Sequence, residues 1–393
     1  MTDRLWTSDY VKAWSCNFLI VFSFMIVTPL LPLYLKDSFG ADKNVIGIVL
    51  SGYTLTALLS RSIGGYLVDS LPRKTVLVVS WIAFSLVYAG YFVTTTLALF
   101  AVVRTLHGVP FATTTVSNAT VAIDVLHSSR RAEGIGFYGL SNNIATAIAP
   151  MAGLYIYGLY GSFDVLFGIA LFTALCGVAL SSTIRLRPRE LNPRHEKISL
   201  DRFFLRNGWS QGICIACFGT AYSVLATYLA IFCKEEMGDA SASGNFFLII
   251  ALGLFCSRLI GSKTLRRGRI VGNATFGVLF SVLGYGCFAL FHNLWSCYVC
   301  AIIVGLGNGH MFPAFNNMFV NLAPACQRGT ANATLLTMWD VGMGLGIVLG
   351  GVAAENLGYV WAFRLSALAQ MVGVVVYFAL ARGRYIRQRL TEF

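Results

Sequence analysis

The stretch SRSIGGYLVDSLPRK, residues 60–74, decides the fold of this chain. It places Arg61 inside an apolar run, continues with two glycines and Asp69, and ends in a Pro-Arg-Lys cluster before the next apolar run begins. Short basic turns between long apolar runs are typical of the turns that join membrane helices on their cytoplasmic side. The stretch therefore predicts the end of one membrane-spanning helix, a tight turn and the start of the next.

A second copy of this pattern lies in the other half of the chain. Residues 257–261, SRLIG, repeat residues 60–64, SRSIG, after 197 positions in a chain of 393 residues, and basic residues follow again. Three further glycines recur in the same order at nearly the same offset. They are Gly108 with Gly309, Gly153 with Gly351, and Gly161 with Gly358. Matched features in register predict two parallel-related copies of one helical bundle.

Composition predicts an all-α integral membrane protein. Hydrophobic residues make up 56% of the chain and charged residues 12%, with a mean hydropathy of +0.70. The net charge of +12 does not indicate nucleic-acid binding, because the basic residues cluster in short loops between apolar runs. Twelve helical spans are expected, at 14–35, 45–68, 75–94, 97–123, 132–158, 162–184, 208–232, 244–263, 270–291, 294–320, 329–354 and 359–381.

The loop charges predict the topology. With the N-terminus inside, 22 of the 29 Lys and Arg residues fall on the cytoplasmic side and three fall outside. This predicts a multi-pass protein of the cell membrane, in a bacterium the inner membrane, with both termini cytoplasmic. Residues 1–184 are expected to form one six-helix bundle and residues 208–393 the other, joined by a basic cytoplasmic linker at 185–207.

The first stretch resembles a known signature. Gly64 or Gly65, Asp69, Arg73 and Lys74 stand as in the turn between the second and third helices of the major facilitator superfamily, with Leu71-Pro72 replacing the usual glycine. The resemblance implies two pseudo-symmetric bundles with a substrate cavity between them near the bilayer midplane. It also implies that Asp69, Arg73 and Lys74 belong to a charge cluster on the inner face.

Two arginines occupy equivalent places in the repeat. Arg61 and Arg258 lie about two turns from the cytoplasmic ends of the second and eighth spans. We interpret them as gating residues that pair in one state and separate in another. The negative charge of Asp69 should in addition suit the positive N-terminus of the eleventh span.

The fourth span contains Arg104-Thr105-Leu106-His107-Gly108, which resembles a motif of proton-coupled antiporters with His107 in place of glutamine. An arginine within a span costs about 2.5–3.5 kcal/mol on insertion scales, so Arg104 should have a partner. The alternative is that Arg104 only braces helices. His107 and its counterpart His310 are candidates for proton handling, and the alternative for each is an ordinary hydrogen-bonding role.

The fifth span resembles the antiporter motif associated with export. Its residues are Gly139, Ala149, Pro150 and Gly153, with Ala149 replacing a glycine. Small residues permit close helix contacts and proline permits a bend, so ordinary packing is the alternative explanation.

Asp340 is the one acidic residue near the middle of a predicted span. Because a charge buried in the membrane is costly, we expect it to be paired, wetted or protonated, which makes it a candidate for proton coupling. The alternative is a fixed ion pair with Arg61. Polar residues expected to line the substrate cavity are Asn17, Asn142, Asn143, Asn308, Asn316 and Trp339.

These patterns predict a secondary transporter, with proton-coupled export of a small organic solute as the first hypothesis. No nucleotide-binding motif is present, so the proton gradient is the expected energy source, without cofactor or metal. An uptake symporter or facilitator for sugar-like solutes and a transport-dead solute sensor remain alternatives. An intramembrane enzyme lacks the necessary spacing of catalytic groups. The expected partners are the solute and the lipid bilayer, with the protein a monomer.

Overall fold

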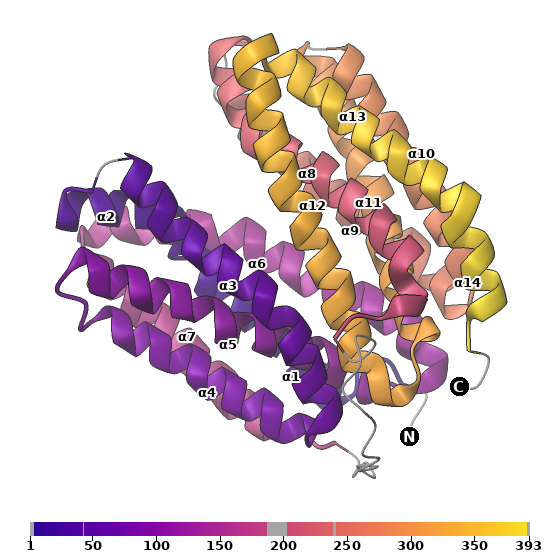
Figure 1. Ribbon diagram of the computed structural model, residues 1–393, viewed down its shortest axis with the longest axis horizontal. Helices are drawn as coiled ribbons and strands as arrows, with labels where there is room; N and C mark the ends of the chain where they lie inside the picture. The colour runs from indigo at the N-terminus through magenta and orange to yellow at the C-terminus, as the bar shows by residue number, and fades with distance from the viewer. Residues whose placement is uncertain (1–3, 42, 187–202, 239–240, 292, 391–393) are drawn as a thin grey trace. The chain divides into compact units, whose positions relative to one another are not determined.

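The computed structural model describes residues 4–41, 43–186, 203–238, 241–291 and 293–390. In these ranges the chain forms α-helices joined by short turns (Figure 1). The helices of the first half are α1 Ser8–Met25, α2 Leu31–Phe39, α3 Lys43–Ser70, α4 Arg73–Tyr91, α5 Leu97–Asp124, α6 Arg131–Tyr160 and α7 Phe163–Ser182. Those of the second half are α8 Trp209–Glu235, α9 Ser241–Arg266, α10 Ile270–Leu290, α11 Leu294–Leu322, α12 Arg328–Leu357, α13 Tyr359–Val376 and α14 Arg382–Gln388.

The expected helical spans are confirmed, with one difference. The first span was expected to run without interruption over 14–35, but α1 ends at Met25 and a 3₁₀ turn at Thr28–Leu30 separates it from α2. Pro29 and Pro32 cause the break, because proline lacks the N–H that a continuous helix requires. Ten stretches among the described residues are long and apolar enough to cross a membrane. The long helices α3 and α6 are not among these ten, and both carry polar residues such as Arg61 and Asn142.

Contacts divide the chain into two compact units. Unit 1 consists of residues 1–127, 138–204 and 326–333, and unit 2 of residues 128–137, 205–325 and 334–393. Helix α6 therefore begins in unit 2 and continues in unit 1, whereas α12 begins in unit 1 and continues in unit 2. Most of the predicted linker, residues 187–202, lies outside the described residues.

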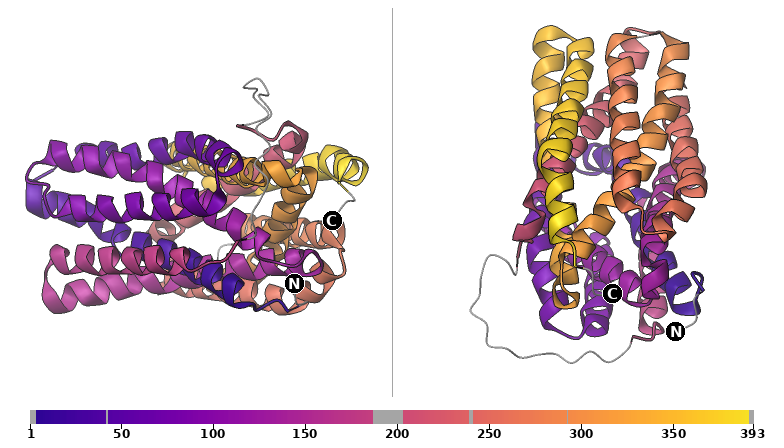
Figure 2. Two further views of the ribbon diagram at one scale, coloured as in Figure 1. Left: turned by 90° about the horizontal axis from the view of Figure 1, so that it is seen from below. Right: turned by 90° about the vertical axis from the view of Figure 1, so that its right-hand side faces the viewer.

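The two units use the same helix pairs. In unit 1, α3 packs on α5, α4 packs on α5 and α7, and α1 packs on α7. In unit 2, α9 packs on α11, α10 packs on α11 and α13, and α8 packs on α13 (Figures 1 and 2). Helices that are equivalent by the sequence repeat thus make equivalent contacts, which confirms a duplicated architecture.

The matched glycines explain why the repeat is visible in the sequence. Gly161 and Gly358 precede α7 and α13, and both have left-handed backbones, with φ of 60° and 89°. A Cβ atom on Gly108 would lie 2.4 Å from the carbonyl oxygen of Tyr53 in α3. One on Gly309 would lie 3.2 Å from the Cα of Leu254 in α9. Only glycine permits both helix crossings at this separation.

Candidate functional site

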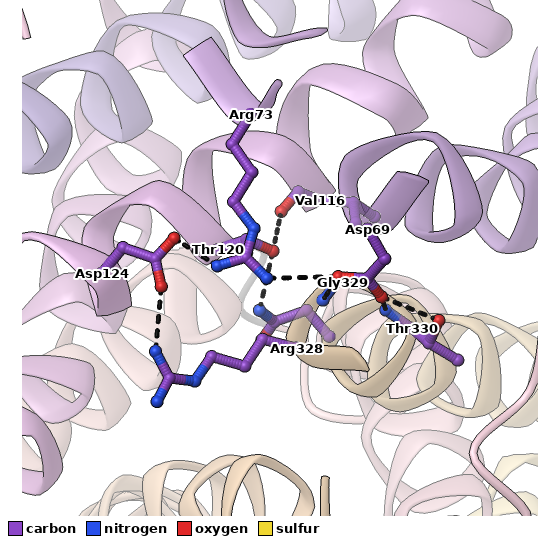
Figure 3. A network of polar contacts seen from close by, with 9 residues as sticks. Asp69, Arg73, Val116, Thr120, Asp124, Arg328, Gly329 and Thr330 are labelled. Atoms are coloured by element: carbon purple, nitrogen blue, oxygen red, sulfur yellow. Dashed lines mark hydrogen bonds and ion pairs between the residues drawn. The ribbon is translucent and has the colours of Figure 1, made fainter. Parts of the chain in front are cut away.

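The carboxylate of Asp69, near the C-terminal end of α3, binds the first turn of α12. It accepts hydrogen bonds from the main-chain N–H groups of Gly329 (2.9 Å) and Thr330 (2.7 Å) and from the Thr330 hydroxyl (2.9 Å) (Figure 3). The first N–H groups of a helix lack partners within the helix and carry a partial positive charge. A carboxylate satisfies both requirements, as the sequence analysis expected for Asp69, and all these residues belong to unit 1.

Two arginines and a second carboxylate complete this network. Arg73, the first residue of α4, lies 3.2 Å from Asp69 and also binds Asp124 at the end of α5. The other oxygen of Asp124 accepts a 2.9 Å hydrogen bond from Arg328, the first residue of α12 (Figure 3). Charges therefore alternate along the chain of contacts from Arg328 to Asp69. We call Asp69, Arg73, Asp124 and Arg328, with the first turn of α12, the inner charge network.

The inner charge network is largely shielded from solvent. Exposed fractions are 7% for the Arg73 side chain and 10% for Asp69, and 17% and 13% for Asp124 and Arg328. At this burial a charge that loses its partner is strongly destabilising, because desolvation is no longer compensated. The network should therefore act as a single unit that is either assembled or fully opened to water.

Two glycines allow the helices to approach closely enough for the network to form. A Cβ atom on Gly65 of α3 would lie 2.7 Å from the Cβ of Ala333 and 3.0 Å from the carbonyl oxygen of Gly329. A Cβ atom on Gly329 would lie 2.7 Å from the carbonyl oxygen of Gly65. A side chain at either position would separate α3 from α12 and so lengthen the hydrogen bonds of Asp69.

Only some of the residues predicted for this face belong to the inner charge network. Asp69 and Arg73 belong to the network, whereas Lys74 is exposed on α4 and forms no hydrogen bond or ion pair with it among the described residues. Neither Asp124 nor Arg328 was among the residues predicted for this face. Asp124 is the last residue of α5, and Arg328 is the first residue of α12. A charged residue at the end of a long apolar helix is the sequence signal that would have identified them.

Arg61 and Arg258 make corresponding contacts within their own units. Arg61 of α3 donates a 3.1 Å hydrogen bond to the Thr115 hydroxyl of α5. Arg258 of α9 donates a 2.7 Å hydrogen bond to the carbonyl oxygen of Gly309 in α11. Both side chains are buried, so each arginine links the two helices that cross at the matched glycine. Their gating role stays a prediction.

Arg104 and His107 meet at one tyrosine in unit 1. Arg104 of α5, 3% exposed, donates to the Tyr91 hydroxyl at 3.3 Å, and that hydroxyl lies 2.8 Å from Nδ1 of His107. The guanidinium also stacks over the rings of Phe24 (5.1 Å to the centroid) and Tyr53 (4.5 Å). The partner that the sequence required for Arg104 is thus a phenol and two aromatic rings, within the described part of unit 1, and not a carboxylate.

His310 of α11 borders a small cavity in unit 2. Its Nδ1 lies 2.9 Å from the carbonyl oxygen of Leu306, so Nδ1 carries the proton and Nε2 is an acceptor. The cavity, about 10 Å³ in volume, is also lined by Arg258, Asn273 and Glu133, and Glu133 pairs with Arg130 at 2.8 Å. A space of this size and polarity suits one water molecule. His310 thus lies beside polar groups of unit 2, whereas His107 belongs to unit 1.

Asp340 is half-buried on α12 in unit 2, next to an aromatic group. The neighbouring Trp339 packs against Tyr222, with centroids 5.7 Å apart, and against Phe312 at 5.3 Å. The coupling role of Asp340 stays a prediction.

The predicted cavity asparagines differ in their surroundings. Asn17 is buried and donates a 2.8 Å hydrogen bond to Ser141, which favours a packing role between α1 and α6. Asn308 accepts a 2.8 Å hydrogen bond from Ser281. The side-chain oxygen of Asn316 is buried and has no hydrogen-bond partner among the described residues. Of the remaining two, Asn142 is exposed and Asn143 half-buried.

The antiporter-like residues of α6 form a close helix contact in unit 1. A Cβ atom on Gly153 would lie 2.2 Å from the carbonyl oxygen of Ile26, at the end of α1. Ala149 is fully buried one turn earlier, Pro150 lies inside the helix, and Gly139 is half-buried. The matching helix α12 approaches α8 in the same way, because a Cβ on Gly342 would meet the carbonyl oxygen of Ala216 at 2.0 Å.

The duplicated helical units, with charge networks and close glycine contacts at helix crossings, define a multi-pass membrane transporter. A sequence model of the Major Facilitator Superfamily matches residues 13–274 and 274–392. The chain therefore belongs to the Major Facilitator Superfamily, and it is a secondary transporter.

Relatives and solved structures agree with this assignment. The staphylopine export protein of Staphylococcus aureus (strain Mu50 / ATCC 700699) is 23% identical over 356 residues, covering 86% of this chain and 88% of the relative. The quinolone resistance protein NorA of Staphylococcus aureus (strain MRSA252) is 21% identical over 345 residues, covering 85% and 87%. A bacterial homologue of the iron transporter ferroportin, in an outward-facing state, superimposes with a TM-score of 0.78 at 14% identity, over 95% of this chain and 99% of that one.

Proposed function

We propose that the protein exports a small organic solute in exchange for protons by alternating access. The observation that carries the proposal is the inner charge network of Asp69, Arg73, Asp124 and Arg328. The network includes the first turn of α12, which belongs to unit 1, whereas α12 from residue 334 onward belongs to unit 2. A movement of unit 2 during the transport cycle would pull on α12, and we propose that the network serves as an inner gate.

Export is supported by the antiporter-like residues of α6 and by the two relatives. One relative is named an export protein and the other a resistance protein. Asp340 is proposed to carry the coupling proton, and Arg104, His107 and His310 to assist it. We place the protein in the cell membrane as a monomer with both termini in the cytoplasm, and we propose no cofactor, metal or nucleic-acid partner.

The direction of transport is tested with membrane vesicles. Inside-out and right-side-out vesicles from cells that make the protein are given a quinolone or staphylopine, the compounds in the relatives' names. Export predicts accumulation in inside-out vesicles when their interior is acidic, and loss of accumulation after a protonophore is added. Accumulation in right-side-out vesicles instead would identify an uptake symporter.

A further inference from the structure

Arg104 carries a buried positive charge that no carboxylate balances. Its side chain is 3% exposed, and no Asp or Glu forms an ion pair with it in the described part of the chain. Of the acids in unit 1, Asp69 and Asp124 are bound to Arg73, and Asp9 pairs with Lys12. Since a charged group within a membrane protein normally has a counter-charge or faces water, this site lacks one component.

The hydrogen bonds around Arg104 leave donors unused. A guanidinium can only donate, so the Tyr91 oxygen accepts from Arg104, and the Tyr91 hydroxyl proton points to Nδ1 of His107. Nδ1 therefore accepts, and the His107 proton sits on Nε2. Among the described residues, neither Nε2 of His107 nor Nε of Arg104 has a hydrogen-bond partner, and both atoms are buried. Nε of Arg328 lacks a hydrogen-bond partner as well, but the Arg328 guanidinium is paired with Asp124, whereas no carboxylate pairs with Arg104 among the described residues.

Aromatic rings, rather than backbone, cover the guanidinium. Phe24 and Tyr53 lie over it and are 7% and 8% exposed, so both rings are buried with Arg104. The half-buried side chains of Met25 and Phe111 pack against these rings. A cation–π contact is weaker than a charge-assisted hydrogen bond, so an anionic oxygen that reaches Arg104 can displace a ring from it.

We propose that Arg104, with Tyr91 and His107, binds the negatively charged group of an organic anion, and that this anion is the transported solute. The carboxylate or phosphate oxygens would accept from the unused Nε–H of Arg104, and the apolar body of the solute would contact Phe24, Tyr53 and Phe111. This inference rests on the proposed transport function and specifies its substrate class. The substrate class follows from the missing counter-charge together with the aromatic cover.

The test compares two probes that differ in charge alone. 2-Naphthoate and 2-naphthamide have nearly the same shape, and only the first is an anion at neutral pH. Binding to the folded protein raises the apparent melting temperature. We expect 2-naphthoate to raise the melting temperature of the purified full chain in a concentration-dependent manner, and 2-naphthamide to have a much smaller effect.

Variants assign the effect to Arg104. Arg104→Gln should weaken the naphthoate response about tenfold or more, since a charge-assisted contact is lost. Arg364→Gln is the matched control, because Arg364 also stacks on a ring, Trp361 at 4.6 Å, but is exposed. It should respond like the wild type. Should Arg104→Gln fail to fold, Arg104→Lys, which keeps the positive charge, gives the answer. In that variant naphthoate, and not naphthamide, should still raise the melting temperature.

Three results would overturn the inference: equal responses to the two probes, no response to naphthoate, or an unchanged response in Arg104→Gln. If vesicles move solutes by a route that Arg104→Gln leaves intact, the anion site is wrong while the transport function stands. If naphthoate binds through Arg104 but no solute crosses the membrane under a proton gradient, the transport function fails and the binding site stands.

Discussion

Asp69 accepts a 2.7 Å hydrogen bond from the main-chain N–H of Thr330, which lies 261 residues further along the chain. Together with the N–H of Gly329 and the Thr330 hydroxyl, this carboxylate binds the first turn of α12. One acidic residue near the end of α3 thereby joins segments from the two copies of the sequence repeat. The consequences of this link can be tested residue by residue.

Asp69→Asn should slow conformational exchange more than it weakens solute binding. The amide removes the charge that complements the α12 N-terminus and Arg73, at a cost of about 1–3 kcal/mol to the closed arrangement. Binding affinity and turnover, measured on the same reconstituted sample, separate the two effects. Asp164→Asn is the matched control, because Asp164 is an exposed acid in the first turn of α7. Normal flux with lost affinity in Asp69→Asn would place Asp69 in the binding site instead.

Asp124→Asn and Arg328→Gln should show coupled effects on stability. These side chains lie 2.9 Å apart and are shielded from solvent, so removing one leaves the other partly unpaired. A double-mutant cycle on the free energy of unfolding should give an interaction energy of about 0.5–3 kcal/mol. The same cycle between Arg328→Gln and Asp164→Asn should be additive. Additivity in the first cycle would mean that the pair contributes nothing to the network.

Gly65→Ala should disrupt the contact of α3 with α12. The new methyl group would lie 2.7 Å from the Cβ of Ala333, and relieving this overlap is expected to cost about 1–3 kcal/mol. Gly168→Ala in α7 is the control, because a Cβ there meets no atom within 4 Å, and it should be neutral or stabilising. Thermal denaturation of the purified variants provides the comparison. Equal melting temperatures would show that α3 and α12 are not in close contact in the molecule in solution.

Asp340→Asn should keep its fold and its solute binding but lose the pH dependence of transport. An amide imitates the protonated carboxyl permanently, so it cannot release a proton during the cycle. Flux measured in proteoliposomes across a range of pH values tests this expectation.

A structural role for Asp340 predicts a different pattern. In that case Asp340→Asn would be unstable, and the double variant Arg61→Gln/Asp340→Asn would regain both stability and proton-driven flux. Proton coupling would then have to be assigned to His107, His310 or Asp124.

The sequence repeat predicted the fold because its signals are local. Glycines at helix crossings and basic turns between apolar runs can be recognised without knowing which helices touch. The matched Gly161 and Gly358 both have a positive φ. The contact of Asp69 with the start of the eleventh span was also predictable, since it follows from the charge of a helix end. The break in the first span, however, was not predicted, although Pro29 and Pro32 indicate it.

The remaining contacts depend on packing between distant segments. Asp124 and Arg328 are 204 residues apart, and no spacing rule joins them. The rings that cover Arg104 come from α1 and α3, so the sequence around Arg104 does not contain them. Asn17 of α1 donates a hydrogen bond to Ser141 of α6, and no spacing rule joins these two residues either. Such contacts follow from how the helices rotate about their axes, which hydrophobic periodicity specifies poorly when nearly every face is apolar.

Proton exchange is the central claim, and proton movement across a sealed membrane tests it most directly. Purified protein is reconstituted into liposomes that contain a trapped pH-sensitive dye and are loaded with solute. Antiport predicts that solute efflux draws protons into the lumen and acidifies it in proportion to the solute moved, with Asp340→Asn moving solute without a change in dye signal. Solute flux by the wild type with no accompanying proton movement would contradict the account.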